Sequence, residues 1–194
     1  MKIVIIKYNA GNVYSVSSAL KRLGYDTIIT SDLKEIESAD KIIFPGVGEA
    51  SSAMEYLKKN QLDKVIPKLK QPFLGVCLGL QLLCEHSEEN DTECLGVFDE
   101  EVKLFPPQKK VPHMGWNLIQ TNKNELFIDL PENSYVYFVH SYFAELSKYT
   151  IAETNYIVPF SAALNKDNFY AVQFHPEKSG VIGEQILKNF IELI

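Results

Sequence analysis

Short apolar runs alternate with segments of helical periodicity in the N-terminal part of the chain, and this alternation constrains the fold more than any other feature. Continuous runs rich in β-branched residues predict buried strands. Between them, apolar residues recur three and four positions apart, as in 13–23, which predicts helices that cover a sheet. Strands that alternate with helices favour right-handed crossovers and a parallel sheet, whose site lies at the carboxyl ends of the strands. The predicted strands are 2–6, 25–30, 41–44 and 72–76.

The C-terminal part has a different pattern, in which strand-like runs follow one another with few helices between them. This pattern predicts mixed or antiparallel strands. A closing helix is predicted over 183–194, and the acidic stretch 85–93 is interpreted as a solvated loop. The strand-like runs are 102–104, 118–119, 135–139, 151–153, 161–164 and 169–174.

The composition argues against several classes of function. A length of 194 residues with 46% hydrophobic residues fits one domain over 1–194, and a net charge of −6 argues against a broad nucleic-acid surface. No apolar run approaches the roughly 20 residues of a membrane span, and the first residues lack a signal-peptide pattern. The cysteines Cys77, Cys84 and Cys94 are odd in number and lack zinc-site spacing. We therefore expect a cytoplasmic protein without a membrane segment, metal, disulfide framework or cofactor.

The segment 75–79, Gly-Val-Cys-Leu-Gly, is the most informative part of the sequence. It follows a predicted strand and opens a predicted helix, which is the form of a nucleophile elbow with Cys77 in place of serine. Small residues on both sides permit the sharp turn, and the helix N-terminus favours the reactive thiolate. The alternative is a buried structural cysteine, the usual state of a free cysteine. The pentapeptide alone does not choose between the two.

A candidate base lies in the segment 174–177, Phe-His-Pro-Glu. Pro176 favours an extended backbone at His175, and in an extended chain residues two apart face the same way. Glu177 can therefore lie beside the His175 imidazole and select its tautomer, while the opposite ring nitrogen faces the thiol. The alternative is a surface turn with an incidental ion pair. The presence of the cysteine elbow in the same chain argues against this alternative.

The glycine-rich segment 45–48 follows the third predicted strand. Such a turn can direct backbone N–H groups into a site. In the elbow scheme, one oxyanion donor follows the nucleophile and another comes from a loop after an earlier strand. Leu78 suits the first role, and Val47 or Gly48 suits the second. A phosphate-binding loop is a weaker interpretation because no Lys-Ser/Thr pair follows. Taken alone, the segment would be a plain strand-end turn.

Together these segments resemble class I glutamine amidotransferases, enzymes with a Cys-His-Glu triad, over essentially the whole chain. Residues 75–81 are similar to the nucleophile signature of that family and 173–177 to its His/Glu signature. The resemblance implies an α/β three-layer sandwich with a mainly parallel central sheet and additional antiparallel strands. Further segments resemble the branch that serves as glutaminase subunit of imidazole glycerol phosphate synthase, namely 45–48, 112–117, 137–142 and 166–170.

The resemblance implies that the chain hydrolyses glutamine to glutamate and ammonia. In that mechanism Cys77 attacks the side-chain amide, His175 carries the thiol proton to the leaving ammonia, and Glu177 holds His175. The N–H groups of Leu78 and Val47 stabilise the oxyanion. The positions that match glutamine-holding residues are Gly48, Gln81, Ser141 and Tyr142.

A partner is also implied by the resemblance. Ammonia would pass through a tunnel to a separate (β/α)8-barrel cyclase, the other half of a heterodimer, which makes imidazole glycerol phosphate and aminoimidazole carboxamide ribotide in histidine biosynthesis. Without the resemblance, Trp116 and Tyr137 would be interpreted as core aromatic residues and Lys178 as an ordinary solvated lysine. The matched interface positions are Asn12, Trp116, Tyr137 and Lys178.

Two departures from the family pattern keep other interpretations open. Lys7 stands where many members carry Asp, and Ile157 where Gly is usual, which questions the local turn because Ile resists positive φ. The alternatives are a paralogue that feeds ammonia to a different barrel, for instance in amidino-sugar synthesis, a cysteine peptidase or deglycase, and a non-catalytic flavodoxin-like binding module.

We also expect the isolated chain to be nearly inactive, because Gly46 and Gly48 tolerate a peptide reorientation that a partner could drive.

Overall fold

The central sheet of the computed structural model, which describes residues 1–9 and 11–194, has eight strands in the order β2-β1-β3-β4-β14-β13-β12-β9. From β2 to β14 the neighbours are parallel, and from β14 to β9 they are antiparallel. The strands are β1 (Ile3–Ile6), β2 (Thr27–Thr30), β3 (Lys41–Gly46), β4 (Phe73–Cys77), β9 (Gln120–Thr121), β12 (Thr150–Asn155), β13 (Pro159–Lys166) and β14 (Phe169–Val172).

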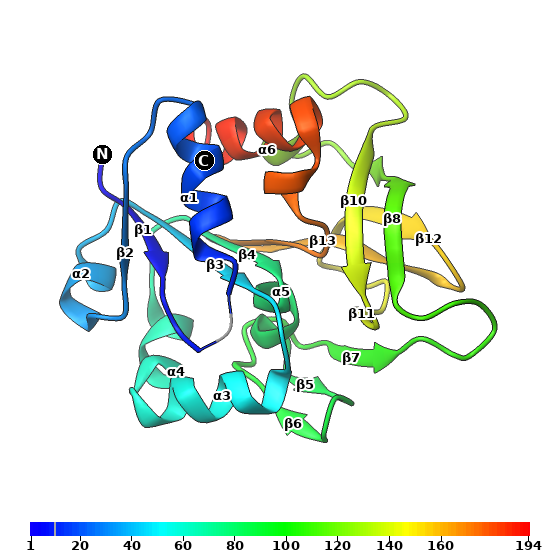
Figure 1. Cartoon of the computed structure of the whole chain (residues 1–194), viewed down its shortest axis with the longest axis horizontal. Coiled ribbons are helices and arrows are strands. Elements are labelled where there is room, and N and C mark those ends of the chain that lie inside the picture. The colour runs from blue at the N-terminus through cyan, green and yellow to red at the C-terminus, as the bar shows by residue number, and fades with distance from the viewer. Residues whose placement is uncertain (10) are drawn as a thin grey trace.

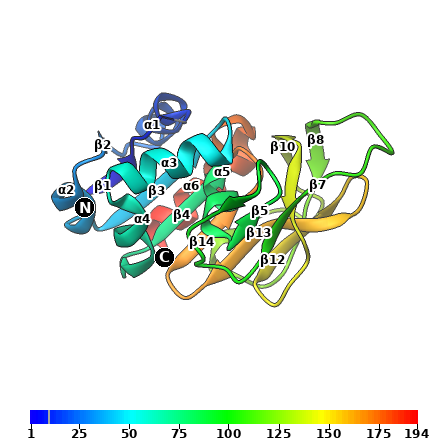
Figure 2. The ribbon, with the colours of Figure 1, turned by 90° about the horizontal axis from the view of Figure 1, so that it is seen from below.

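Helices cover both faces of this sheet, which confirms the predicted three-layer α/β fold. In Figure 1 the helices α1 (Val13–Arg22) and α6 (Gly180–Glu192) lie above the sheet, whereas α3 (Ala50–Lys59) and α4 (Leu62–Val65) lie below it. Figure 2 shows the molecule from the side of α3 and α4. The remaining helices are α2 (Leu33–Glu37), α5 (Leu78–Leu83) and the 3₁₀ turns η1 (Ile66–Lys68), η2 (Glu125–Phe127) and η3 (Pro176–Lys178).

Two hydrophobic cores form because successive residues of a strand point to opposite faces. In β1, Val4 and Ile6 pack into the core with α2, α3, α4 and α5, whereas Ile3 and Ile5 pack into the core with α1 and α6. The continuous apolar runs of the sequence are therefore explained by burial on both sides. None of the helices formed by residues 1–9 and 11–194 is long and apolar enough to cross a membrane.

Two smaller sheets stand at the edge where the glycine-rich turn and the elbow end. One is an antiparallel pair, here called the ribbon, in which Tyr135 of one strand pairs with Leu118 of the other. Figure 1 shows the ribbon at the right, beyond β13. The ribbon consists of β8 (His113–Leu118) and β10 (Tyr135–His140), and the other small sheet of β5 (His86–Ser87), β6 (Thr92–Glu93), β7 (Glu101–Leu104) and β11 (Tyr142–Ala144).

The structure corrects several expected boundaries. Strand β3 continues past Phe44, because Pro45 and Gly46 keep the parallel register with the end of β4. Strand β14 ends at Val172 rather than at 174. The acidic stretch 85–93 is not simply a solvated loop, because it contains the paired strands β5 and β6. Strand β8 covers 113–118, of which the sequence indicated only the end. For β3 and β8 the pairing strand is distant in the sequence, whereas β5 and β6 form a local hairpin.

Candidate active site

Cys77 stands at a sharp turn between β4 and α5, as the sequence predicts. Its backbone has φ of +54° and ψ of −107°, a region that residues with a Cβ rarely adopt and that marks stored strain. The flanking residues must be small. A Cβ on Gly79 would collide with the carbonyl oxygen of Phe44, and one on Gly75 would lie 2.9 Å from the carbonyl oxygen of Gly79. The glycines let the helix cross close to the sheet, and the turn places Cys77 at the carboxyl edge.

His175 and Glu177 form a buried pair behind the cysteine. Nδ1 of His175 lies 2.9 Å from Oε1 of Glu177, and each side chain is 1% exposed. The Asn12 side-chain amide donates to the same carboxylate oxygen at 3.3 Å. The backbone differs in one respect from the expectation: His175 is extended, but Glu177 lies in the 3₁₀ turn η3 rather than in an extended segment. The pair therefore meets across a tight turn that Pro176 begins.

The second imidazole nitrogen of His175 is turned to the cysteine side. Nε2 is buried and makes no hydrogen bond that meets standard geometry with residues 1–9 or 11–194. Burial lowers the pKa of His175, but the Cys77 thiol and the Glu177 carboxylate outweigh it and raise the pKa to about 10. A protonated imidazole beside a thiol favours the thiolate–imidazolium pair that nucleophilic cysteine chemistry uses. Catalytic hydrogen bonds are often long or poorly aligned before substrate binds.

A cavity of about 340 Å³ opens in front of Cys77. Its walls come from four regions: the turn after β3, the elbow, the β5–β6 hairpin and the end of the ribbon. The predicted oxyanion and glutamine-holding residues all lie in these walls, whereas His175 and Glu177 lie behind the nucleophile. The lining residues are Val47, Gly48, Cys77, Leu78, Gln81, Glu89, Pro112, Val139, His140, Ser141 and Tyr142.

The oxyanion candidates come from two turns, the elbow at Cys77 and the turn after β3. Leu78 begins α5, where backbone N–H groups have no partner within the helix. Val47 lies on the turn after β3, and the φ of +121° at Gly48 is a value that favours glycine. Both turns end at the same sheet edge, because Gly46 is in register with Cys77.

Two residues at the site were missed by the sequence interpretation. Gln173 is fully buried; its amide donates to Cys77 Sγ at 3.7 Å and its oxygen accepts from Gln81 Nε2 at 3.1 Å. Glu89 is the acidic residue among those that line the cavity, and its carboxylate accepts from the Ala50 N–H at 2.7 Å. Gln173 belongs to a signature segment, which was the available signal. Glu89 had none, because its segment was interpreted as a solvated loop.

The predicted interface residues lie outside the cavity lining and differ in their exposure. Trp116 is 56% exposed on the ribbon, and its ring meets Tyr137 edge-on with centroids 6.1 Å apart. Tyr137 is half-buried, and its carbonyl oxygen accepts from the His175 N–H at 2.9 Å. Lys178 is exposed on η3 and Asn12 is half-buried. Neither aromatic side chain is a core residue, so the core alternative is wrong for both.

The two departures from the family pattern lie away from the cavity walls. Lys7 is exposed, and its N–H extends the pairing of β1 by donating to Thr30 O at 2.8 Å. Ile157 does not have a positive φ, so its side chain is not strained in the way that the sequence suggested.

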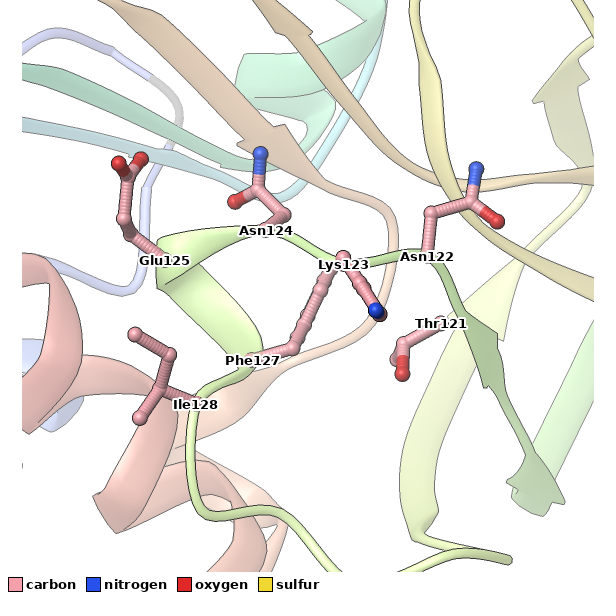
Figure 3. A pocket seen from close by; sticks show the side chains of 7 residues that line it. All are labelled: Thr121, Asn122, Lys123, Asn124, Glu125, Phe127 and Ile128. Carbon is pink, nitrogen blue, oxygen red and sulfur yellow. The ribbon is translucent and has the colours of Figure 1, made fainter.

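A second hollow, of about 550 Å³, lies elsewhere and is shown in Figure 3. All its lining residues come from the continuous segment 121–128, between β9 and the end of η2, and their side chains spread around an open depression. It contains neither the cysteine nor a histidine. The chemistry of the fold therefore belongs to the smaller cavity at Cys77.

Comparison with known proteins identifies the family. The family profile described as "Glutamine amidotransferase class-I" matches residues 4–193. Proteins named imidazole glycerol phosphate synthase subunit HisH from Bacteroides fragilis (strain YCH46) and Bacteroides thetaiotaomicron are 59% and 57% identical, over 100% of this chain and 100% of their own length. The protein of that name from Vibrio parahaemolyticus is 46% identical over 99% of this chain and 98% of its own.

Solved structures support the fold. The crystal structure of a glutamine amidotransferase has a TM-score of 0.74 at 19% identity and covers 100% of this chain and 98% of its own. The structure of PurLQS from Thermotoga maritima has a TM-score of 0.77 at 16% identity, covering 99% of this chain and 98% of that one. At such identities the likeness concerns the fold alone. With the full-length sequence matches, the elbow and the His-Pro-Glu turn, the chain belongs to the class-I glutamine amidotransferase family.

Proposed function

We propose that this chain, acting as a single domain of residues 1–194, is the glutaminase subunit of an imidazole glycerol phosphate synthase and uses Cys77, His175 and Glu177 as its triad. The observation that carries the triad is the strained elbow at Cys77, which opens to a cavity in front and has the buried His175–Glu177 pair behind it. The full-length relatives named for this synthase support the choice of pathway. Free Cys77, Cys84 and Cys94 suit a cytoplasmic location, where thiols stay reduced.

The geometry supports a two-step acyl transfer. The Cys77 thiolate attacks the side-chain amide carbon of glutamine, and the N–H groups of Leu78 and Val47 stabilise the negative charge on the amide oxygen. The C–N bond then breaks as His175 gives its proton to the leaving nitrogen, which departs as ammonia. In the second step His175 accepts a proton from water, the hydroxide attacks the thioester, and glutamate leaves with the Cys77 thiolate restored.

The cavity walls suit an amino acid as the substrate. Glu89 offers a carboxylate that can pair with an α-ammonium group. Burial is the largest of the effects that raise the pKa of this carboxylate, and the hydrogen bond from the Ala50 N–H opposes it. Gly48, Ser141 and Tyr142 line the same cavity. Such polar groups fix the orientation of a small ligand, while the apolar walls supply its burial. Gln81 contributes through its carbonyl, since its amide nitrogen is engaged by Tyr142 O at 3.0 Å and by Gln173.

The outer face of the ribbon supports a protein partner, proposed as the (β/α)8-barrel cyclase of a heterodimer. Met114 and Tyr135 are 61% and 53% exposed beside Trp116. Exposed aromatic and methionine side chains are enriched at protein interfaces. This face adjoins η3, where Lys178 follows the His175–Glu177 pair. Docking there would place the cyclase beside the site that releases ammonia.

The decisive experiment measures glutamate release from the purified chain alone, with the cyclase, and with the cyclase plus its acceptor nucleotide. We expect the rate to rise across the three conditions. A partner can shift the equilibrium of the oxyanion peptide only by binding the active form more tightly, so a rise would mean that the cyclase and its nucleotide prefer that form. Cys77→Ala in the same assay is the control for contaminating glutaminase. A barrel protein of amidino-sugar synthesis serves as the competing partner, and activation by that protein alone would favour the paralogue. A chain that releases no glutamate under any condition would contradict the proposal.

A further inference from the structure

A pair of histidines outside the triad is buried at the cavity, and one of them, His140, belongs to its lining. His113 on β8 and His140 at the end of β10 are 3% and 5% exposed. Both belong to the inner face of the ribbon and pair directly across it, with Nδ1 of His113 3.0 Å from Nε2 of His140. The His113 ring is also held between Phe138 and Tyr156, with centroid distances of 4.8 and 4.2 Å. Such confinement leaves each ring a single orientation.

The hydrogen-bond partners determine which nitrogen of each ring carries the proton. Nδ1 of His140 lies 2.7 Å from the carbonyl oxygen of Tyr142, which can only accept, so this nitrogen is the donor. Burial lowers the pKa of His113 to about 4 and of His140 to about 3, so both rings are neutral at physiological pH. Nε2 of His140 is therefore an acceptor, and Nδ1 of His113 must donate to it. Nε2 of His113 in turn accepts from the Asn117 amide at 3.3 Å.

The chain of hydrogen bonds continues from Tyr142 to the nucleophile. The Tyr142 carbonyl oxygen accepts a second bond from Gln81 Nε2, at 3.0 Å. Gln81 Nε2 also donates to Gln173, whose own amide donates to Cys77 Sγ. One carbonyl thus joins the two histidines to the residues beside the thiol. The same carbonyl belongs to the Ser141–Tyr142 wall of the cavity.

We propose that His113 and His140 are positioning residues, a neutral relay that holds the Ser141–Tyr142 wall and the Gln81 amide in place for glutamine. The inference rests on the proposed glutaminase function. The relay also bonds the ribbon to the pocket, because His113 and Asn117 lie on the inner side of the strand that carries Trp116 on its outer side. A second charge here would harm catalysis, since His140 is near enough to His175 for the two rings to repel each other when both are protonated.

The first test determines the tautomers directly. Nitrogen-15 NMR of the full wild-type chain at about pH 6.5 reports the protonation of each imidazole nitrogen, and His113 and His140 are assigned by single substitution. The relay requires both rings to be neutral and both to carry the proton on Nδ1. A proton on Nε2 of either ring, or a charged ring, overturns it. This measurement needs neither the partner nor turnover.

The second test separates hydrogen bonding from the filling of space. The amide nitrogen of Asn can replace Nδ1 of a histidine, whereas that of Gln replaces Nε2, and Gln is closer to histidine in volume. The relay uses Nδ1 as donor at both positions. His113→Asn and His140→Asn should therefore be milder than His113→Gln and His140→Gln. A role in packing alone predicts the reverse order.

The readout is the rate at which a glutamine-like electrophile labels Cys77, measured against reagent concentration. We expect His140→Gln to raise the concentration of electrophile that gives half the limiting labelling rate by about tenfold, because a buried group is left unpaired. The limiting labelling rate itself should change far less. His86→Gln, on the β5–β6 hairpin, is the matched histidine control and should behave as wild type. Gln variants as mild as the Asn variants overturn the relay.

The outcomes also separate this inference from the proposed function. Wild-type chain that the electrophile does not label at Cys77, even with the cyclase and its acceptor nucleotide present, rejects the proposed function and with it the positioning role, whatever the tautomers. Wild-type labelling with the wrong tautomers, or with the wrong order of variants, rejects the relay and leaves the glutaminase standing.

Discussion

Nδ1 of His175 lies 2.9 Å from Oε1 of Glu177, and both side chains are withdrawn from solvent. This contact suits the proposed role of Glu177 as the group that orients the base rather than one that meets substrate. We expect His175→Ala to lower steady-state glutamate release by at least about 10²–10⁴-fold, the usual contribution of a positioned acid–base group. Glu177→Gln should lose less, because Gln can still hold the ring. Rates in the opposite order would reject the assignment.

The strained backbone at Cys77 predicts an unusual order of stabilities. Cys77→Ala should abolish turnover but keep the fold, and Cys84→Ala and Cys94→Ala should retain turnover. Glycine normally destabilises a folded chain relative to alanine by about 0.5–1 kcal/mol. At φ of +54° this preference should vanish or reverse, so that Cys77→Gly is at least as stable as Cys77→Ala. Urea unfolding of the two variants measures the order, and a clear advantage for alanine would argue against elbow strain.

Glu89 is expected to act on substrate binding rather than on chemistry. Glu89→Gln keeps an oxygen that can accept from the Ala50 N–H, so the hairpin should stay folded. Loss of the charge should raise KM for glutamine about tenfold with little change in kcat, as for an interaction present in both ground and transition states. Glu93→Gln, exposed on the same hairpin, is the control. An unchanged KM would remove Glu89 from the glutamine site.

The buried hydroxyl of Tyr8 is expected to lower the stability of the folded chain. It is buried, makes no hydrogen bond within residues 1–9 and 11–194, and lies where a Cβ on Gly46 would be. Burial, and then the Cys77 thiol, raise its pKa well above the usual range. Tyr8→Phe should therefore raise the melting temperature, by roughly 2–8 °C for a chain of this size.

A matched variant checks the sign of that effect. The Tyr156 hydroxyl donates to the Lys110 carbonyl oxygen at 2.6 Å. Tyr156→Phe should lower the melting temperature slightly, because it removes one hydrogen bond at an exposed site. If Tyr8→Phe also lowers the melting temperature, the Tyr8 hydroxyl is not a buried unpaired group.

The free energy of unfolding should fall on both sides of about pH 6.5, and different histidines should cause the fall on each side. Below that pH the unfolded chain protonates His113 and His140, whose folded pKa values are about 4 and about 3, so stability is lost as pH falls through this window. Above it the folded chain keeps the proton of His175, whose pKa is about 10, so that contribution is lost as pH rises.

Two substitutions separate the limbs of this profile. His140→Asn should flatten the acid limb of the unfolding free energy, measured by urea titration at several pH values, and leave the alkaline limb. His175→Asn should flatten the alkaline limb only. An acid limb that persists unchanged in His140→Asn would show that other groups cause it.

Much of the fold, and the elbow that carries the candidate nucleophile, could be predicted from the sequence because their signals are local. Strand β1 is an unbroken apolar run, α1 repeats its apolar residues at helical spacing, and the glycines around Cys77 stand where the elbow has no room for a Cβ. The His175–Glu177 pair spans two residues, so the chain itself brings the side chains together. The predicted route through an extended backbone was nevertheless wrong, because η3 intervenes.

By itself, then, the sequence determined the alternating α/β layers, the family, and the candidates proposed here as nucleophile and base. Only the tertiary structure decided which polar groups surround them. Glu89 enters the cavity because β5 and β6 pair and fold over α3, and Gln173, just after β14, reaches Cys77 across 96 positions of sequence. The tautomers of His113 and His140 follow from a carbonyl on a third strand. Such contacts leave no periodicity in the sequence, because long-range packing selects the partners and local backbone preference does not.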